Sequence, residues 1–511
     1  MHAAGVLERL KTLIVWQGAS YGTFSPSLSL FSMISSLKQL YVSLARQGWD
    51  RWFWWMLVGV EAVLCWAVVK WVPYTEIDWE AYMQEVDGYR GGERDYLQIR
   101  GGTGPLVYPA GFLYLYDGLR AMASTATGGG GDDNNGSGDV FIDIRRVQHI
   151  FCVLYVLHVA VVLQLYTQVA RRCATALISS SRHSPQDEYE KATTAAHVVW
   201  FWRVAMGICC LSKRMHSIFV LRLFNDAPAM FLLYLSTLFF SRNCWRSGCV
   251  IYSLGVSIKM NVLLFAPGLL LLLLQATPNI YETILCLSIC AMVQLVLGAP
   301  FLLTYPVSYI RKAFEFDRVF FYKWTVNWKF LPEDVFVSKP LSVALLSLHI
   351  VCLILFAKKW IQACQRQTKN RQCLFLGQTL TPEYVVHTLF LANYIGICFA
   401  RTLHYQFYSW YFHTIPWLVC MSLLSPSPWS SCSKTTSHSV HTILVPSMVL
   451  LIAFMAAIEY SYNVFPATAT SSAILQLAHF TILWILWRSQ VPEIILSQPP
   501  MTVDNSSKKI T

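Results

Sequence analysis

The chain has 511 residues, of which 55% are hydrophobic and only 13% are charged. Soluble domains carry about 25% charged residues, so this composition excludes a water-soluble globule. The formal net charge of +11 does not indicate a nucleic-acid-binding protein, because the Lys and Arg residues lie mostly between apolar blocks and form no basic face.

The apolar blocks are long enough to cross a bilayer, since a membrane-spanning helix needs about 20 apolar residues. They are continuous rather than alternating, which predicts helices and excludes a β-barrel. We therefore predict an all-α polytopic membrane protein with about 11–13 transmembrane helices, the count within residues 244–304 being left open. The expected spans are residues 52–72, 147–167, 196–212, 218–240, 244–258, 260–275, 281–304, 340–357, 383–400, 406–424, 442–459 and 472–487.

Basic loops set the expected orientation. The loops at 171–191 and 358–371 should be cytosolic by the positive-inside rule. Alternating the spans from these loops gives a cytosolic N-terminal segment, 1–51, and a cytosolic tail, 489–511. The tail ends in KKIT, a dilysine pattern that resembles an endoplasmic reticulum retrieval signal read by cytosolic machinery.

The same alternation gives a set of segments that should share the luminal face: residues 73–146, 213–216, 305–339 and 401–405. The first of them contains GGGGDDNNGSGD at 128–139, a flexible low-complexity insert with a glycosylation sequon at Asn135. The 15 Cys residues avoid the two long luminal segments, so no disulfide framework is expected.

The first polar cluster on this face is YTEIDWEAYM, directly after the first span. Trp79 and Tyr82 follow at helical spacing, which predicts a short amphipathic helix. Two interpretations are open. Asp78, alone or in a capping box with Thr75, caps this helix. Alternatively Asp78, with Glu76, is a carboxylate that acts as general base on a hydroxyl group.

Two further clusters contain unusual backbone or charge. GGTGPLVYPAG at 101–111 is rich in turns but matches neither a Walker loop nor a dinucleotide fingerprint. RLFND puts Arg222, Asn225 and Asp226 inside a predicted span, where polar groups are costly unless they pair or line a cavity. Arg222 and Asp226 at i, i+4 could form a structural ion pair, or these groups could face a substrate.

The fourth cluster consists of two aromatic and cationic runs, KWTVNWK at 323–329 and RTLHYQFYSWYFH at 401–413. Their aromatics are typical of an interfacial belt, whereas their cations could neutralise a lipid phosphate. An acidic patch and cationic patches on one membrane face suit a reaction with a lipid phosphate leaving group. No paired Cys/His spacing indicates a metal site.

Six segments in order over residues 71–466 carry a resemblance to a known family: YTEIDWEAYM, GGTGPLVYPAG, HSIFVLRLFND, KMNVLLFAPG, WTVNWKFLPE and LHYQFYSWYFHT. They resemble the eukaryotic dolichyl-phosphate-mannose-dependent alpha-1,3-mannosyltransferases of N-glycan assembly. The chain departs from the family at 1–50, 128–139, 174–191 and 425–439, where no chemistry is expected.

The resemblance implies a GT-C glycosyltransferase fold, with residues 52–488 as a transmembrane catalytic domain in the endoplasmic reticulum membrane. It implies dolichyl phosphate mannose as donor and the five-mannose lipid-linked oligosaccharide as acceptor, with inversion at the anomeric carbon and no cofactor or metal. The family's acidic motif falls on Glu76 and Asp78, with Asp78 the expected base and Glu76 the alternative.

The resemblance also suggests roles for the other clusters. Arg401 and His404 are expected to contact the donor phosphate, with Arg222 and Lys323 as further candidates. Eight residues are expected to bind substrate: Trp79, Tyr108, Asn225, Asp226, Asn327, Trp328, Tyr405 and Gln406.

Three other functions fit parts of the pattern. A mannosyltransferase acting on glycosylphosphatidylinositol precursors would share the donor and architecture. A lipid-linked sugar transporter would show inverted repeats and polar groups at the bilayer midplane, whereas here the polar clusters gather on one face. A non-catalytic subunit of a larger complex is the third alternative.

Overall fold

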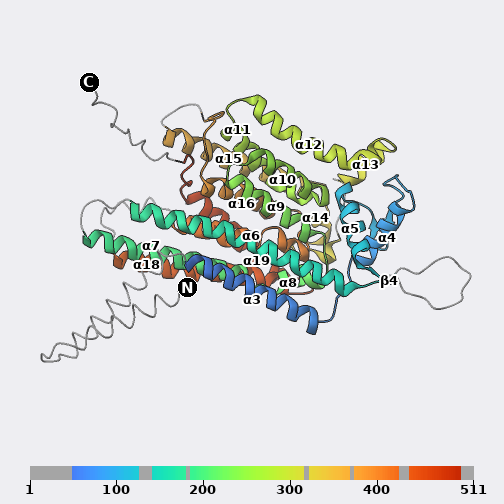
Figure 1. Ribbon diagram of the computed structural model, residues 1–511, viewed down its shortest axis with the longest axis horizontal. Coiled ribbons are helices and arrows are strands. Elements are labelled where there is room, and N and C mark those ends of the chain that lie inside the picture. Colours follow the sequence, from blue (N-terminus) through green and yellow to red (C-terminus); the bar gives the residue numbers. More distant parts are fainter. Residues whose placement is uncertain are drawn as a thin grey trace, which may run out of the picture. The chain divides into compact units, whose positions relative to one another are not determined.

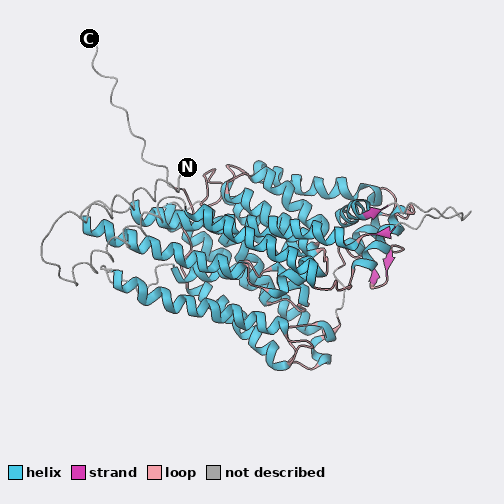
Figure 2. Cartoon of the chain, turned by 60° about the horizontal axis from the view of Figure 1, so that its bottom comes forward, coloured by secondary structure: helices cyan, strands magenta, loops and turns pink. Residues whose placement is uncertain are grey.

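The computed structural model of the protein describes residues 49–125, 141–179, 185–315, 321–368, 373–424 and 437–496 (Figure 1). This part of the chain is almost entirely helical (Figure 2), which confirms the all-α prediction. Its paired strands are two-residue ribbons: β1 (Arg100–Gly101) with β2 (Gly104–Pro105), and β3 (Ser124–Thr125) with β4 (Phe141–Ile142). The predictions for residues 1–48, for the 128–139 insert with Asn135, and for the KKIT tail lie outside the described residues.

The first half of the chain forms seven helical elements before a break at residue 222. They are α3 (Trp49–Trp71), α4 (Trp79–Arg90), α5 (Ala110–Ala123), α6 (Ile144–Ser179), α7 (Pro185–Cys209), α8 (Lys213–His216) and the π-helical turn η1 (Ser217–Leu221).

The second half is also helical, with 3-10 turns between some helices. Its elements are α9 (Asp226–Ser241), α10 (Trp245–Ile258), η2 (Met260–Phe265), α11 (Ala266–Ala276), α12 (Ile280–Leu302), α13 (Pro306–Ala313), η3 (Tyr322–Trp324), α14 (Glu333–Phe336), α15 (Lys339–Thr368), α16 (Pro382–Cys398), η4 (Tyr405–Trp410), α17 (Thr414–Leu424), α18 (Ser437–Asn463) and α19 (Ala469–Arg488).

Every predicted span coincides with helical structure, but not all are long, continuous helices. Six helices of the described chain are long and apolar enough to cross a bilayer, or seven if the bent α7–η1 pair counts as one span. The predicted spans 218–240 and 406–424 are wrong as continuous helices, because the chain leaves helix at 222–225 and begins the second segment in η4. Broken helices are tolerated at membrane depth where protein surrounds them. The count of 11–13 spans stays a prediction.

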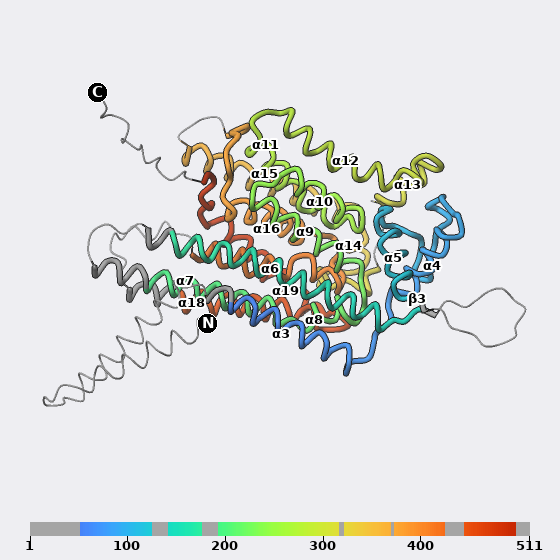
Figure 3. Tube along the Cα trace, viewed as in Figure 1, coloured from blue at the N-terminus to red at the C-terminus, as the bar shows by residue number. Residues whose placement is uncertain are grey.

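The short helices form the interior of the bundle. The Cα trace shows α9, α10 and α16 running side by side (Figure 3), and α9 packs against both of the others. Every residue of α16 is buried. By contrast, only 17% of the apolar window of α12 and 11% of that of α15 are buried. Their exposed side chains are mostly apolar, as expected of helices that face lipid.

A small unit of α4, α5 and β1–β2 follows the first span, and α4 confirms the predicted short helix. Three rings form its core, Tyr82 lying 5.1 Å from Phe112 and 4.9 Å from Tyr116 between centroids. An ion pair between Arg90 and Asp117 at 2.8 Å joins α4 to α5.

The segments expected to share one membrane face do contact one another. Three hydrogen bonds join them: Thr75 N–H to the Leu221 carbonyl at 3.2 Å, Ala110 N–H to the Tyr309 hydroxyl at 3.4 Å, and Val326 N–H to the Leu403 carbonyl at 2.8 Å. Segments predicted to face the same side therefore lie at the same end of the bundle, and this end contains the polar site described below.

Gly111 tests the packing of α5 against α10. A Cβ at Gly111 would lie 2.1 Å from Ser257 Oγ and 2.9 Å from the Ser257 carbonyl oxygen, whereas a Cβ at Gly118 in the same helix would meet nothing within 4 Å. We expect Gly111→Ala to destabilise the protein by about 1–3 kcal/mol through overpacking. Gly118→Ala should be neutral or stabilising by up to about 1 kcal/mol. Thermal unfolding in detergent measures both, and equal midpoints for the two variants would contradict the packing.

Candidate active site

The candidate site is built around the break between η1 and α9. The chain leaves the π-helical turn at Arg222, and Leu223 takes a φ of 52°. A left-handed conformation costs a branched residue about 1–2 kcal/mol, and such strain tends to gather at functional sites. The Tyr116 hydroxyl donates to the Leu223 carbonyl at 2.9 Å and so holds the break against α5. The break places Asn225 and Asp226 at the start of α9 with their side chains buried in the bundle.

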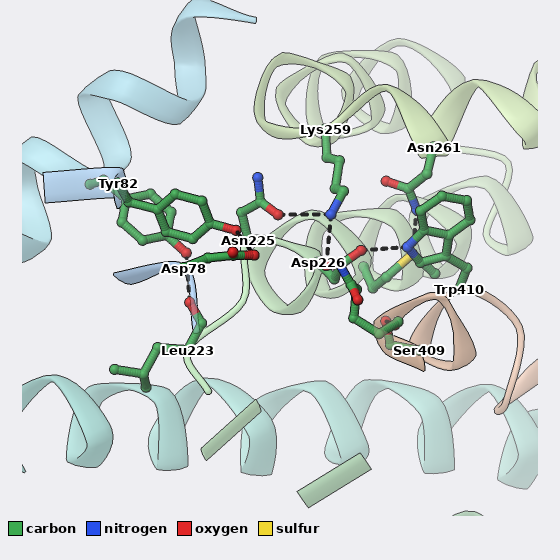
Figure 4. A network of polar contacts seen from close by, with 12 residues as sticks. Asp78, Tyr82, Leu223, Asn225, Asp226, Lys259, Asn261, Ser409 and Trp410 are labelled. Carbon is green, nitrogen blue, oxygen red and sulfur yellow. Dashed lines mark hydrogen bonds and ion pairs between the residues drawn. The ribbon is translucent and has the colours of Figure 1, made fainter. Parts of the chain in front are cut away.

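A lysine from a separate helix pair meets these two side chains. Lys259, at the junction of α10 and η2, donates from Nζ to Asp226 Oδ2 at 2.7 Å and to Asn225 Oδ1 at 2.8 Å. The Trp410 indole N–H donates to Asp226 Oδ1 from the opposite side (Figure 4). Asp226 is fully buried, and a buried carboxylate is stable only when it is paired in this way. The i, i+4 ion pair of Arg222 with Asp226 is wrong, because the two residues do not share a helix and Asp226 pairs with Lys259.

Aromatic rings surround the lysine. Its Nζ lies 5.6 Å from the Tyr108 ring, 5.7 Å from Phe407 and 6.0 Å from Trp410. Cation–π attraction holds an ammonium group at such distances. These rings come from the 101–111 turn segment and from η4, so Lys259 draws two of the predicted clusters together.

Asp78 is positioned next to this centre, and Glu76 makes that possible. Asp78 occupies the N-cap position of α4, but its side chain makes no capping hydrogen bond. Glu76 caps the helix instead, accepting from the Glu80 N–H at 3.1 Å and from the Tyr74 hydroxyl. The capping interpretation of Asp78 is therefore wrong. Its carboxylate is half-buried and accepts one long hydrogen bond, from the Tyr82 hydroxyl at 3.4 Å.

Burial dominates the electrostatics of Asp78. Desolvation raises the pKa of its carboxyl group above the ordinary value of 3.8, and the negative charge of Asp226 adds to this rise. The positive charge of Lys259 acts in the opposite direction. Asp78 is thus close enough to the Lys259–Asp226 pair to sense both charges. A carboxylate with a raised pKa is a stronger base once ionised, as general-base catalysis requires.

A second cluster joins residues 325–328 to residues 400–403. Asn327 uses its whole amide here, its Oδ1 accepting from the Thr325 hydroxyl and the Leu403 N–H while its Nδ2 donates to the Ala400 carbonyl. The Trp328 indole donates to the same carbonyl at 2.9 Å. Both side chains therefore clamp two loops together. Their predicted contact with substrate stays a prediction, and the structure assigns their polar atoms to the clamp.

The predicted phosphate-binding cations lie in different places. Arg401 donates from Nη1 to Ser342 Oγ at 3.0 Å, beside the loop clamp. Lys323 is exposed, with its ammonium 4.9 Å from the Trp324 ring. His404 stacks on Phe407 with ring centroids 5.2 Å apart, which places it next to the Lys259 centre. Arg222 lies in the break itself.

The remaining predicted substrate residues divide in the same way. Trp79 is buried, with its ring 5.8 Å from that of Tyr116, and it packs in the core of the α4–α5 unit. Tyr405 begins η4, where its hydroxyl donates to the Val464 carbonyl at 2.8 Å. Gln406 follows it and is half-buried. Tyr108, Asn225 and Asp226 are the predicted residues that the fold brings directly to Lys259.

Sequence reasoning missed Lys259 and Trp410. Lys259 had a usable signal, because it is the one Lys or Arg residue between positions 247 and 304. A lone cation in a long apolar region needs a buried partner, and Asp226 was already a candidate for it. Trp410 lay within an aromatic run that an interfacial belt explained equally well.

One group of potential metal ligands also escaped the sequence analysis. Ligand atoms of Glu61, Cys65 and His216 lie within 4.8 Å of one another in the bundle. His216 already uses both ring nitrogens, Nε2 with Glu61 Oε2 at 2.8 Å and Nδ1 with the Ser212 carbonyl at 2.8 Å. A metal ion there would have to replace the contact with Glu61, so the arrangement is satisfied as a hydrogen-bonded pair that fastens α3 to α8.

Comparison with known proteins follows the same segments. The family model described as ALG3 protein matches residues 55–472. A Mus musculus protein named Dol-P-Man:Man(5)GlcNAc(2)-PP-Dol alpha-1,3-mannosyltransferase is 41% identical over 435 residues, covering 83% of each chain. The Homo sapiens protein of that name is 41% identical, covering 85% of this chain and 87% of its own. The Arabidopsis thaliana protein is 40% identical, covering 84% and 86%. The chain therefore belongs to the ALG3 protein family, the family of alpha-1,3-mannosyltransferases that its sequence motifs resemble.

Proposed function

We propose that the protein transfers mannose from dolichyl phosphate mannose to the five-mannose lipid-linked oligosaccharide, Man(5)GlcNAc(2)-PP-dolichol, and forms an alpha-1,3 linkage. The names of its relatives specify this donor, acceptor and linkage for those proteins. The observation that carries the proposal to this chain is the half-buried Asp78 carboxylate beside the buried Lys259–Asp226 pair. The site faces the endoplasmic reticulum lumen in this proposal, and the C-terminal tail with its dilysine sequence faces the cytosol.

The reaction is a single displacement. Asp78 accepts the proton of the acceptor's 3-hydroxyl while that oxygen attacks the anomeric carbon of the donor mannose. The bond from the anomeric carbon to the phosphate oxygen breaks at the same time, and its electron pair leaves with dolichyl phosphate. The transition state resembles an oxocarbenium ion, as in glycoside hydrolysis, and the configuration at the anomeric carbon inverts.

Three carboxylates lie near the site, and Asp78 suits the role of base best. Asp226 is fully buried, and both its oxygens accept hydrogen bonds from Lys259 and Trp410. Glu76 is exposed and is occupied in capping α4. Asp78 combines partial exposure, a raised pKa and a single long hydrogen bond, so its carboxylate can reach a substrate hydroxyl.

The alternatives use the same membrane architecture. A mannosyltransferase for glycosylphosphatidylinositol precursors would keep the donor but change the acceptor, and a transporter would move the lipid without forming a bond. The relatives' names favour the N-glycan acceptor. Product analysis decides among them, because only the proposed enzyme adds one alpha-1,3-linked mannose to the five-mannose acceptor.

Asp78→Asn should abolish transfer while the protein keeps its fold. A general base contributes about 10²–10⁴-fold to the rate, and asparagine keeps the shape without the basic oxygen. Purified variant and wild type would be incubated with donor and acceptor, and the product's mass and linkage determined. Glu76→Gln is the matched control and should retain most activity. Turnover by Asp78→Asn at the wild-type rate would remove Asp78 from the mechanism.

The pH dependence should report the ionisation of Asp78. The base acts when deprotonated, so kcat/KM should fall as the pH falls through the pKa of Asp78, which lies above 3.8. Asp226→Asn removes a charge that raises this pKa and should move the acidic limb to lower pH. Asp117→Asn, which removes a carboxylate paired with Arg90, should leave the limb in place. A shift to higher pH in Asp226→Asn would contradict the assignment.

Transfer should not need a divalent metal. Phosphate is already a good leaving group, and protein cations rather than a metal ion can stabilise its charge. We expect the rate to be unchanged in EDTA. If EDTA abolishes transfer and added Mn²⁺ restores it, the metal-free mechanism is wrong. Glu61→Gln would then show whether the Glu61–Cys65–His216 group is responsible.

A further inference from the structure

Two arginines flank the π-helical turn that precedes the catalytic break. Arg214 belongs to α8, and Arg222 follows η1. Their positive charges are close enough to repel each other. Two like charges in a partly buried position are unfavourable unless an anion joins them. No ion pair joins either arginine to a carboxylate in the part of the chain that the structure describes.

The contacts of Arg214 leave much of its guanidinium uncommitted. One nitrogen, Nη2, donates to the Tyr462 carbonyl at 2.7 Å. The guanidinium carbon lies 5.3 Å from the centre of the Tyr405 ring. The Nε atoms of Arg214 and Arg222 are both buried and lack a hydrogen-bond partner among the described residues. Unpaired buried donors cost free energy, which a bound acceptor would recover.

One carboxylate does lie in the neighbourhood of Arg214. Glu459 acts favourably on the charge of Arg214 but is not within ion-pair distance. Its oxygens accept from the Ser212 hydroxyl at 2.9 Å and from Asn463 Nδ2 at 3.0 Å. A single carboxylate with other partners leaves the arginine pair with an excess of positive charge.

The arginine pair is joined to the catalytic centre by two short segments. Arg222 precedes Asp226 by four residues across the break. Tyr405, which lies under Arg214, begins the 3-10 turn η4 that ends at Trp410, and Trp410 donates to Asp226. In addition, the Thr75 N–H donates to the Leu221 carbonyl, so the segment that leads to Asp78 contacts the residue before Arg222.

We propose that Arg214 and Arg222 together bind the phosphate of the dolichyl-linked donor, so that its mannose points toward Asp78. This inference rests on the proposed function. A guanidinium presents parallel N–H donors that match phosphate oxygens. As the bond between the anomeric carbon and the phosphate oxygen breaks, the leaving phosphate gains a negative charge, and two fixed guanidinium groups stabilise it. Arg401 bonds to Ser342 beside the loop clamp and is not needed for this contact.

A direct binding measurement tests this without turnover. The purified full-length protein in detergent would be titrated with fluorescently labelled dolichyl phosphate, with unlabelled dolichyl phosphate and dolichol as competitors. Arg214→Gln and Arg222→Gln should each weaken dolichyl phosphate binding by about tenfold or more, the loss expected for a charged hydrogen bond. Arg90→Gln removes a cation from a surface ion pair of α4 and should bind as the wild type does. Dolichol should compete equally weakly with every variant.

Each other outcome would overturn the proposal. Unchanged dolichyl phosphate binding in Arg214→Gln and Arg222→Gln excludes these residues from the phosphate site. A raised KM for the lipid-linked acceptor with unchanged dolichyl phosphate binding assigns them to the acceptor's diphosphate instead. Weakened binding in Arg401→Gln alone moves the site to residues 400–403. Arg222→Gln breaks none of the hydrogen bonds described above, so it separates lost phosphate binding from lost folding, which thermal unfolding measures. Failure of the wild type to transfer mannose would count against the proposed function and leave this result readable.

Discussion

The ion pair between Lys259 and Asp226 is the interaction on which the rest of the site depends. Both charges lie inside the bundle, and removing one partner from a buried pair costs about 3–5 kcal/mol, because the other charge stays without compensation. Satisfying Asp226 requires the chain to leave helix before α9, the junction of α10 and η2 to place Lys259 opposite it, and η4 to supply the Trp410 indole. One buried carboxylate thus fixes the relative positions of three segments that are distant in sequence.

That pair separates the structural carboxylate from the reactive one. Asp226 has no free oxygen, so it holds the site together and contributes its charge. Asp78 is free because Glu76, two residues earlier, supplies the cap that α4 needs. The same economy recurs in the loop clamp, where Asn327 uses its whole amide to join residues 325–328 to 400–403. Residues that share one short motif therefore have different physical tasks, and exposure and hydrogen bonding distinguish them.

Much of this could be predicted from the sequence, within a clear physical limit. Continuous apolar blocks predicted the helices, and charged loops predicted which segments share one end of the bundle. The motif around Asp78 predicted a short helix with an acidic start. The long-range pairing of Lys259 with Asp226 could not be deduced from local pattern, since the residues are 33 positions apart and each had a nearer candidate partner or none. Arg222 at i, i+4 was the obvious local partner for Asp226, but a π-helical turn and a strained Leu223 remove that geometry.

The broken helices follow from the same constraint. A continuous helix over 218–240 would satisfy every backbone group but would point Arg222, Asn225 and Asp226 in different directions around its axis, because successive residues are about 100° apart. Leaving helix for four residues turns Asn225 and Asp226 toward Lys259 and leaves Arg222 beside the segment that leads to Asp78. The cost is a strained Leu223 and several backbone groups without helical partners, which Tyr116 partly compensates. An interior helix that is too short and too irregular to span a bilayer by itself is therefore the structural requirement for gathering acid, amide and cation at one point.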